Sequence, residues 1–496
     1  MNKALIFKII GLIMMIEAAL MLLPMLVSIL CHESSWSIFL LAAIGTAIVG
    51  AALYLLIKPK KNMLLSADGF IITAAAWVIL AACGAVPFML SGAFSNYLEA
   101  FFETVAGFTT TGITVLADVT VLDHGMLFWR SLTHWIGGMG VLVFMLALAP
   151  VAGGGTSLKL LKAESPGPFK EKLTPKISQG AKWLYVIYIA MTIVEACALM
   201  IAGMTPFTSL IVTFGTVATG GFAYLNTSLA TLTVAQQIIV EIFMLLAGIN
   251  FGLIFMVVTG KLKGIKKNEE LRWYLIITFA AAAIIYFDLI TNNVFASNGE
   301  SIHHAIFGSI SSITSTGYSS TDMNLWPWYS KGIIVLLMYI GGCSGSTAGG
   351  IKVSRFIILL KALRRYITEL AHPRSVNEIK YNDKKLSSEV IRGTLVYFCL
   401  IVVISVVSII IVSIDPEMDF STSFASVATT LNNNGIDFHG VSVGGYGTFQ
   451  WYTQIVYIID MIIGRLEIFP VIILLNTLFS PIGKLSKHIK RKTAVS

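Results

Sequence analysis

The stretch Thr109-Thr110-Thr111-Gly112-Ile113-Thr114 is the part of the chain that decides the fold. It follows a short apolar run, residues 96–108, and precedes a second apolar run that is long enough to cross a membrane. Non-helical backbone is tolerated at membrane depth only where protein buries it or where it lines a watery path. An uncharged strip of Thr and Gly is typical of backbone carbonyls that face an ion. The sequence therefore predicts an ion-contacting loop at this position.

Three later segments repeat the pattern. They read Ala218-Thr219-Gly220-Gly221-Phe222, Thr314-Ser315-Thr316-Gly317-Tyr318 and Asn432-Asn433-Asn434-Gly435-Ile436. With Gly112, Gly220, Gly317 and Gly435 taken as the central glycines, the spacing is roughly 97 to 118 residues, which indicates internal repetition. Four carbonyl-bearing loops from one chain can enclose a single axial pore. The alternative is four tight turns that only cap helices.

Composition places the chain among polytopic membrane proteins. Of its 496 residues, 56% are hydrophobic and only 12% are charged, and the mean hydropathy is +0.82. Soluble domains usually carry about 25% charged residues. Apolar runs of about 20 residues, the length that spans a bilayer, recur along the whole chain. The five cysteines are scattered and predict neither a metal site nor a disulfide framework.

Charged residues alternate in sign from loop to loop. Lys and Arg gather at residues 58–61, 159–182, 261–272, 352–392 and 484–492, whereas the intervening loops carry mostly Asp and Glu. The positive-inside rule then places both termini in the cytoplasm. The formal charge of +8 thus reflects membrane topology and does not indicate nucleic acid as a partner. The basic loops 153–180 and 364–392 fit either a regulatory subunit or anionic membrane lipid.

The chain divides into a prefix and four similar units. Residues 1–62 supply two spans, 4–30 and 36–57, and the units cover 63–155, 156–265, 266–365 and 366–496, the last with a cytoplasmic tail. In each unit we expect an outward helix, a short half-membrane helix, the strip and a returning helix; the returning helices are expected at 127–149, 235–259, 328–360 and 452–475. The negative end of the short helix's dipole favours a cation. The predicted fold is an all-α polytopic membrane protein with four helix–pore-loop–helix repeats around a pseudo-fourfold pore, preceded by two transmembrane helices.

The strips supply the predicted ion-binding groups. Carbonyl rings can replace the hydration shell of an ion, and glycine permits backbone torsions that a side chain forbids. We expect the metal ion, potassium, at the backbone carbonyls of Thr110, Thr111, Gly112, Ala218, Thr219, Gly220, Ser315, Thr316, Gly317, Asn433, Asn434 and Gly435.

The third returning segment is unusual in its middle. Residues 341–350 read Gly-Gly-Cys-Ser-Gly-Ser-Thr-Ala-Gly-Gly, which has poor helix propensity and hydroxyls that compete for backbone hydrogen bonds. The pattern predicts a broken helix that lines the cavity under the strips. The alternative is helix packing through a Gly-x-x-x-Gly ladder of Gly341, Gly345 and Gly349.

Three motifs resemble the Trk/Ktr/HKT superfamily of potassium transporters, and most closely its bacterial TrkH-type subunits. They are Phe128-Trp-Arg-Ser-Leu-Thr-His-Trp-Ile-Gly-Gly-Met-Gly140, Gly345-Ser-Thr-Ala-Gly-Gly-Ile-Lys352 and Gly464-Arg-Leu-Glu-Ile-Phe469. The resemblance covers residues 69 to 496 in matching order, and the two-helix prefix fits the TrkH branch. It implies a potassium uptake protein of the bacterial inner membrane that makes no covalent bond.

The resemblance also implies a gate, a barrier and partners. An intramembrane gating loop would contain Gly341, Gly342, Ser344, Gly345, Ser346, Thr347, Gly349 and Gly350. Arg465 would be an electrostatic barrier near the pore, with a salt bridge to Glu467 or Asp460 as the alternative; Arg130 and His134 are expected at the membrane boundary. The protein would be a homodimer with a cytoplasmic TrkA-type nucleotide-binding subunit. It would carry no covalent cofactor, and nucleotide would act only through that partner.

Other classes fit less well. A transporter built from inverted repeats predicts oppositely oriented units, whereas every unit here begins and ends on the basic side. A membrane-embedded enzyme needs a clustered nucleophile and base or a metal set, which His134, His303 and His304 do not form. Sodium- or proton-coupled potassium symport is the alternative function; no buried carboxylate pair stands out for it, although Glu195 and other acidic residues lie in apolar runs.

Overall fold

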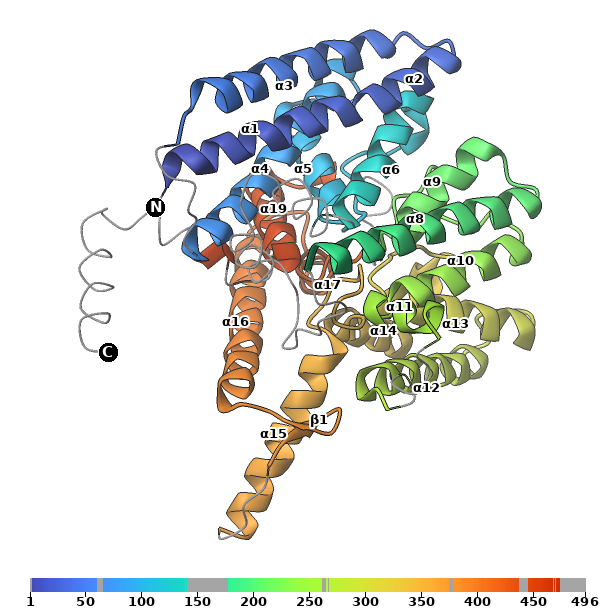
Figure 1. Cartoon of the computed structure of the whole chain (residues 1–496). Helices are drawn as coiled ribbons and strands as arrows, with labels where there is room; N and C mark the ends of the chain where they lie inside the picture. The colour runs from blue at the N-terminus through green and yellow to red at the C-terminus, as the bar shows by residue number, and fades with distance from the viewer. Residues whose placement is uncertain are drawn as a thin grey trace, which may run out of the picture.

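The chain forms an all-α membrane protein (Figure 1). The computed structural model describes residues 2–59, 66–138, 140, 177–260, 265, 267–373, 378–436, 445–466, 468 and 470–472. Within these ranges six helical segments are long and apolar enough to cross a membrane, and a bent helix pair makes a seventh if counted as one span. The polytopic all-α prediction is therefore confirmed. The strands described are limited to one hairpin, β1 (Lys380–Tyr381) and β2 (Lys384–Lys385).

The prefix is a pair of antiparallel spans. The first consists of α1 (Lys3–Leu20) and α2 (Leu22–Leu30), and the second is α3 (Trp36–Leu56). The two lie along one side of the molecule (Figure 1). They approach closely because Gly11 faces Gly50: a Cβ at Gly11 would lie 2.6 Å from the Gly50 carbonyl oxygen. Small residues of this kind allow helix backbones to pack closely in a membrane.

The remaining helices follow the predicted order in four units. Each unit begins with an outward helix; these are α4 (Ser66–Ser91), α8 (Ile177–Ile201), α12 (Glu269–Thr291) and α16 (Ser388–Val412). A short helix follows; these are α5 (Tyr97–Phe108), α9 (Pro206–Val217), α13 (Asn298–Ile313) and α17 (Phe420–Leu431). The short helices start sharply because a polar side chain caps each one, Asn96, Thr205, Ser297 and Asp419 respectively.

The returning helices differ between units. They are α6 (His124–Gly138), α10 (Val234–Ala247) with α11 (Phe251–Val258), α14 (Trp328–Ile340) with α15 (Val353–Ala371), and α19 (Trp451–Leu466). The break between α14 and α15 agrees with the predicted broken helix. The parts of the first and fourth predicted helices beyond α6 and α19 lie largely outside the described residues.

The prediction of one continuous helix over residues 235–259 is wrong. The backbone bends by 101° between α10 and α11. Two backbone hydrogen bonds from the third unit occupy the break: Cys343 N–H donates to the Gly248 carbonyl at 2.9 Å, and Phe251 N–H donates to the Gly345 carbonyl at 3.1 Å. Asn250 caps α11 by accepting from Gly252 N–H at 2.7 Å. The break is therefore a tertiary effect that the local sequence does not reveal.

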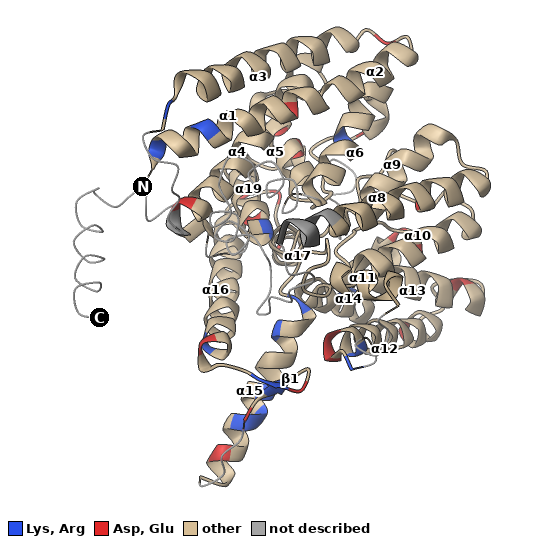
Figure 2. Ribbon diagram, viewed as in Figure 1, with Lys and Arg blue, Asp and Glu red and all other residues tan. Residues whose placement is uncertain are grey.

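Charge is distributed unevenly over the molecule. Figure 2 shows Lys and Arg at the start of α1 and along α15 and the β1–β2 hairpin, while the α2–α3 loop carries one acidic residue, Glu33. The helix α15 protrudes from the helical body (Figure 1). Several large apolar side chains of α15 are nevertheless exposed, among them Leu363 and Leu370.

The Gly11–Gly50 crossing gives a test of prefix packing. Gly11→Val should lower the melting temperature of the detergent-purified protein, because overpacking a close contact costs about 1–3 kcal/mol. Gly45→Val on α3 is the matched control, since a Cβ there meets nothing within 4 Å. Equal melting temperatures for the two variants would show that the crossing does not constrain the fold.

Candidate functional site

All four strips leave their short helices through the same turn. The first residue of each turn has a positive φ, namely 55° at Thr110, 55° at Thr219, 56° at Ser315 and 49° at Asn433. This left-handed conformation is uncommon for residues other than glycine. The next N–H then donates to the carbonyl five residues earlier, as in a Schellman helix terminus; the pairs are Thr111–Ala106, Gly220–Gly215, Thr316–Ser311 and Asn434–Thr429, at 2.8 to 3.0 Å.

This shared turn corrects the alignment of the second strip. Thr219 occupies the place of Thr110, so Gly221, and not Gly220, is the counterpart of Gly112. Gly221 has φ of 76°, close to the 84° of Gly112. The predicted trio that starts at Ala218 is therefore one residue early, because Ala218 lies at the helix C-cap. Because Gly220 and Gly221 are adjacent, the spacing along the sequence does not show which of them corresponds to Gly112.

The strips lie side by side in a closed ring. At each glycine an added Cβ would meet the backbone of the next strip, so that strip 1 faces strip 2, strip 2 faces strip 3, strip 3 faces strip 4 and strip 4 faces strip 1. The contacts would be Gly112 to Gly220 O at 2.0 Å, Gly221 to Thr316 O at 1.9 Å, Gly317 to the Gly435 backbone at 2.3 Å and Gly435 to Thr111 O at 3.0 Å. The four loops therefore meet, which four separate helix-capping turns would not require.

The ring is uncharged and is faced by four helix C-termini. Each strip follows directly on α5, α9, α13 or α17, so the negative ends of four helix dipoles lie next to it. Thr110, Thr219, Ser315 and Asn433 are all completely buried. Within the described part of the chain there is no group of three or more His, Cys, Asp and Glu residues that could hold a metal ion. The oxygen atoms at the ring are therefore uncharged ones, from backbone carbonyls and from Thr, Ser and Asn side chains.

Side chains join each strip to its neighbours. Asn433 donates from Nδ2 to Thr111 Oγ1 at 3.0 Å, and Asn434 donates from Nδ2 to the Ser312 carbonyl at 2.9 Å. The Tyr318 hydroxyl lies 3.2 Å from the Phe222 carbonyl. The asparagines of the fourth strip therefore act as cross-links. Asp437, which the sequence places just beyond this strip, lies outside the described residues.

The loop of residues 341–352 lies against the same ring. Thr347 Oγ1 donates to the Val217 carbonyl at 3.1 Å, Gly349 N–H donates to Ser315 Oγ at 2.5 Å, and Gly350 N–H donates to the Asn432 carbonyl at 3.1 Å. The loop thus touches three of the four units at the start of their strips.

The same loop is not a helix, so the Gly-x-x-x-Gly ladder is not formed. Gly341, Gly345 and Gly350 have φ of 72°, 76° and 75°, which favours glycine strongly. Gly349 does make a close approach, since its Cβ would lie 2.2 Å from the Asn432 carbonyl oxygen. That approach is between a loop and a strip rather than between two helices.

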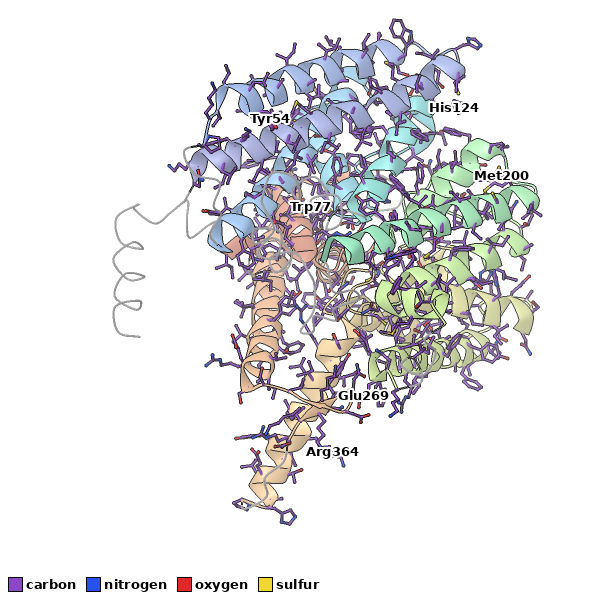
Figure 3. The ribbon with its side chains drawn as sticks, in the orientation of Figure 1. Tyr54, Trp77, His124, Met200, Glu269 and Arg364 are labelled. Carbon is purple, nitrogen blue, oxygen red and sulfur yellow. The ribbon has the colours of Figure 1, made fainter. Side chains whose placement is uncertain are left out.

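Arg465 connects the loop to the first unit. Its guanidinium donates to the Thr347 carbonyl at 2.9 Å and to the Gly137 carbonyl at 2.7 Å. The ring of Trp77, labelled in Figure 3, lies 5.9 Å from the guanidinium carbon. The alternative partner Asp460 instead accepts a hydrogen bond from Ser408 at 2.9 Å, and Glu467 lies outside the described residues.

Arg130 and His134, which the sequence analysis expects at the membrane boundary, lie in the interior of the protein. Both are buried, with exposed fractions of 2% and 0%. Arg130 Nε lies 2.6 Å from Glu103 Oε1, and the His134 ring stacks on Phe222 with 4.0 Å between centroids. Sequence reasoning missed Glu103, although a carboxylate in an otherwise apolar short helix was a signal that a cation lies opposite.

Comparisons with known proteins agree with this architecture. The model of the TrkH family, described as a cation transport protein, matches residues 36–486. The chain is 33% identical to the Trk system potassium uptake protein TrkH of Escherichia coli K12, over 96% of this chain and 98% of the relative. It is also 33% identical to TrkH of Halomonas elongata, over 97% of this chain and 99% of that one.

A solved structure matches at nearly full length. The crystal structure of the potassium transporter TrkH from Vibrio parahaemolyticus superposes with a TM-score of 0.86 at 30% sequence identity. The match covers 97% of this chain and 99% of that one. At this extent the likeness includes the two-span prefix and all four units.

The corrected register can be tested with alanine substitutions. A Cβ at Gly220 would lie 2.2 Å from His134 Nδ1, whereas one at Gly221 would meet the Thr316 backbone oxygen. Both Gly220→Ala and Gly221→Ala should destabilise the protein, by about 1–3 kcal/mol for overpacking. Only the loss from Gly220→Ala should be partly recovered by adding His134→Ala, because only that clash involves a side chain.

The measurement is a double-mutant cycle on melting temperature, since neighbouring sites couple and distant ones add. If His134→Ala coupled to Gly221→Ala as strongly as it couples to Gly220→Ala, the assignment of Gly221 as the counterpart of Gly112 would be wrong.

Proposed function

The chain belongs to the TrkH family of cation transport proteins, and from this premise we propose that it carries potassium into the cell through the ring of four strips. The relatives are named as potassium uptake proteins. The observation that carries the proposal is the closed contact of backbone with backbone at Gly112, Gly221, Gly317 and Gly435. Uptake of this kind is transport and makes or breaks no covalent bond.

In this proposal the strips form the selectivity filter. The carbonyls of residues 110–112, 219–221, 315–317 and 433–435 replace water around a dehydrated potassium ion. The dipole ends of the four short helices compensate for the positive charge. The cross-links made by Asn433, Asn434 and Tyr318 support the proposal, because a filter that holds its width can favour one ion over a smaller one.

Residues 341–352 are the proposed gate under this filter. The loop contacts the starts of three strips through Thr347, Gly349 and Gly350. It is not helical, and three of its glycines have positive φ, so its path is set by contacts with neighbouring segments and not by a helical ladder of hydrogen bonds. Arg465, which donates to the Thr347 carbonyl, places a positive charge beside the loop and is the proposed barrier to cation flux.

The gate has a physical connection to the cytoplasmic side. The buried Glu270 carboxylate accepts from Ser344 N–H at 2.6 Å and from Ser354 N–H at 3.3 Å, on the two limbs of the loop. The preceding Glu269, labelled in Figure 3, pairs with Lys361 of α15 at 2.5 Å, and its N–H donates to Asn382 Oδ1 in the turn of the hairpin at 2.8 Å. A partner that moves α15 or the hairpin would therefore reach the loop through the start of α12.

The proposed setting is the bacterial inner membrane, with both termini in the cytoplasm and the chain acting as a homodimer. The basic character of α15 and the hairpin supports a cytoplasmic location for them. The proposed regulatory partner is a TrkA-type subunit that binds nucleotide, so that this chain holds no cofactor of its own. Membrane lipid covers the apolar flanks.

Potassium symport coupled to sodium or protons is the second candidate. One observation favours it: the Glu195 carboxyl in α8 is completely buried, and neither oxygen has a hydrogen-bond partner among the described residues. Intramembrane carboxyl groups of this kind often mark ion or proton pathways. Uptake driven by membrane potential alone, without a sodium or proton gradient, would exclude this candidate.

The filter is tested by rubidium and sodium uptake in cells that lack their own potassium importers. The wild-type chain should take up rubidium and support growth at low potassium. Gly112→Ser should lower the preference for rubidium over sodium by about tenfold, equivalent to about 1.4 kcal/mol between the ions, because its Cβ would lie 2.0 Å from the Gly220 carbonyl oxygen.

Gly92→Ser is the control for the filter variant. Gly92 also has a positive φ, 74°, but a Cβ there meets nothing within 4 Å. If Gly112→Ser has the ion preference of the wild-type chain, strip 1 is not part of the filter.

The role of Arg465 is tested by separating its charge from its shape. Arg465→Ala should raise rubidium flux per protein molecule in liposomes severalfold, because an intramembrane positive charge near a cation path opposes entry. Arg465→Lys retains the charge but cannot span the Thr347 and Gly137 carbonyls with a planar fork, and it should keep the flux low. Equal gains for both variants would indicate that Arg465 acts as a brace and not as a barrier.

A further inference from the structure

The junction between strips 1 and 2 contains a buried ion pair. Glu103 lies on α5 and Arg130 on α6, and their side chains are 0% and 3% exposed. Arg130 Nε lies 2.6 Å from Glu103 Oε1. Neither residue is part of a strip, and neither is needed to supply a carbonyl to the ion.

Each partner also holds the outer end of a different strip. Glu103 accepts from the Thr114 hydroxyl at 3.0 Å and from Val115 N–H at 3.1 Å, just after Gly112. Arg130 Nη1 donates to the Ala223 carbonyl at 2.8 Å, just after Gly221. One ion pair therefore joins the segment that follows strip 1 to the segment that follows strip 2.

An aromatic stack extends this connection to the strip itself. The Arg130 guanidinium carbon lies 3.5 Å from the centroid of the Phe222 ring, and this ring also stacks in parallel on the His134 ring. Phe222 directly follows Gly221. His134 Nδ1 lies 3.4 Å from Phe222 N, and a Cβ on Gly220 would collide with it. Arg130 and His134 thus both pack against Phe222, the residue that directly follows Gly221 of strip 2.

The other junctions use neutral groups. The Tyr318 hydroxyl serves between strips 2 and 3, the Asn434 amide between strips 3 and 4, and the Asn433 amide between strips 4 and 1. A buried ion pair is weak evidence for stability, because the desolvation of both charges can cancel their attraction, and its best-attested benefit is to fix one geometry. The planar, five-donor guanidinium suits that purpose.

We infer that Glu103 and Arg130 are positioning residues that set the spacing of strips 1 and 2 and thereby the ion preference of the filter. Neither side chain contacts the ion. The inference rests on the proposed function of the ring. It assigns the charged junction a role in discrimination between potassium and sodium, which a pair that served only folding would not have.

The test compares ion preference among purified variants in liposomes. Arg130→Lys keeps the charge but loses the fork that reaches both Glu103 and Ala223. Glu103→Gln keeps the size but replaces one acceptor oxygen by an NH2 donor, so the one remaining oxygen cannot accept from both Val115 N–H and Arg130 Nε. We expect each to lower the ratio of rubidium to sodium uptake by about tenfold, the scale of one lost charge-assisted hydrogen bond.

Two further variants complete the design. Thr114→Val removes one donor to Glu103 without changing any charge, and it should lower the same ratio by a smaller factor. Glu241→Gln is the matched control. This carboxylate lies 3.4 Å from His303 Nδ1 and does not contact the ring of four strips. It should leave the ratio at the wild-type value.

The outcomes are separable because uptake is normalised to the folded protein that elutes as one peak on size-exclusion chromatography. A wild-type ratio in folded Arg130→Lys and Glu103→Gln overturns the inference while leaving the proposed function intact. If these two variants and Thr114→Val fail to fold while Glu241→Gln folds, the ion pair serves folding, and the inference is again overturned. A wild-type protein that takes up neither ion removes the proposed function, and the inference with it.

Discussion

The structure depends on backbone lying directly against backbone where the four strips meet. At Gly112, Gly221 and Gly317 there is no room for even one methyl group, because the next strip's main chain occupies that volume. Such closeness needs each strip to leave its helix in the same direction, which the repeated left-handed residue and the backbone hydrogen bond after it achieve. The capped short helices and the outward helices around them hold those four turns in place.

Two helix breaks meet beneath the ring, and the backbone groups of each break form hydrogen bonds with those of the other. Helix α10 ends at Ala247 and α14 ends at Ile340, which would leave backbone donors and acceptors unpaired in the membrane. The Gly248 carbonyl accepts from Cys343, and Phe251 donates to Gly345, so the groups freed by one break are taken up by the other. This agrees with the rule that irregular backbone at membrane depth is tolerated only inside protein.

The fourfold arrangement is approximate because each junction is built from different side chains. A charged pair lies at one junction, a tyrosine at the next, and asparagines at the other two. Beneath the ring, only the third unit supplies the loop of residues 341–352, and only the fourth supplies Arg465. A single chain can therefore adjust one side of its pore without changing the others, which a pore made of four identical subunits cannot do.

Much of the architecture was predictable from sequence because it is repeated and local. Apolar length, alternating loop charge and the recurring Thr-Gly pattern predict a polytopic all-α protein with four pore-loop units. The Gly-rich composition of residues 341–350 predicts a break in the third returning helix. These signals can be recognised without knowing any distant contact. The thickness of the bilayer sets the length of a spanning helix, and glycine permits unusual backbone torsions wherever it occurs.

Other features were decided only by contacts between distant residues. The break after Ala247 exists because a loop some hundred residues later donates into it. The choice of Gly221 over Gly220 depends on which of them faces Thr316 and which faces His134. Arg130 and His134 are buried because Glu103 and Phe222 lie opposite them. By itself the sequence determined which segments are long and apolar enough to cross a membrane and where the Thr-Gly pattern repeats. Register, burial of charge and helix breaks were decided by the fold, because each depends on which atoms fill the space next to a residue.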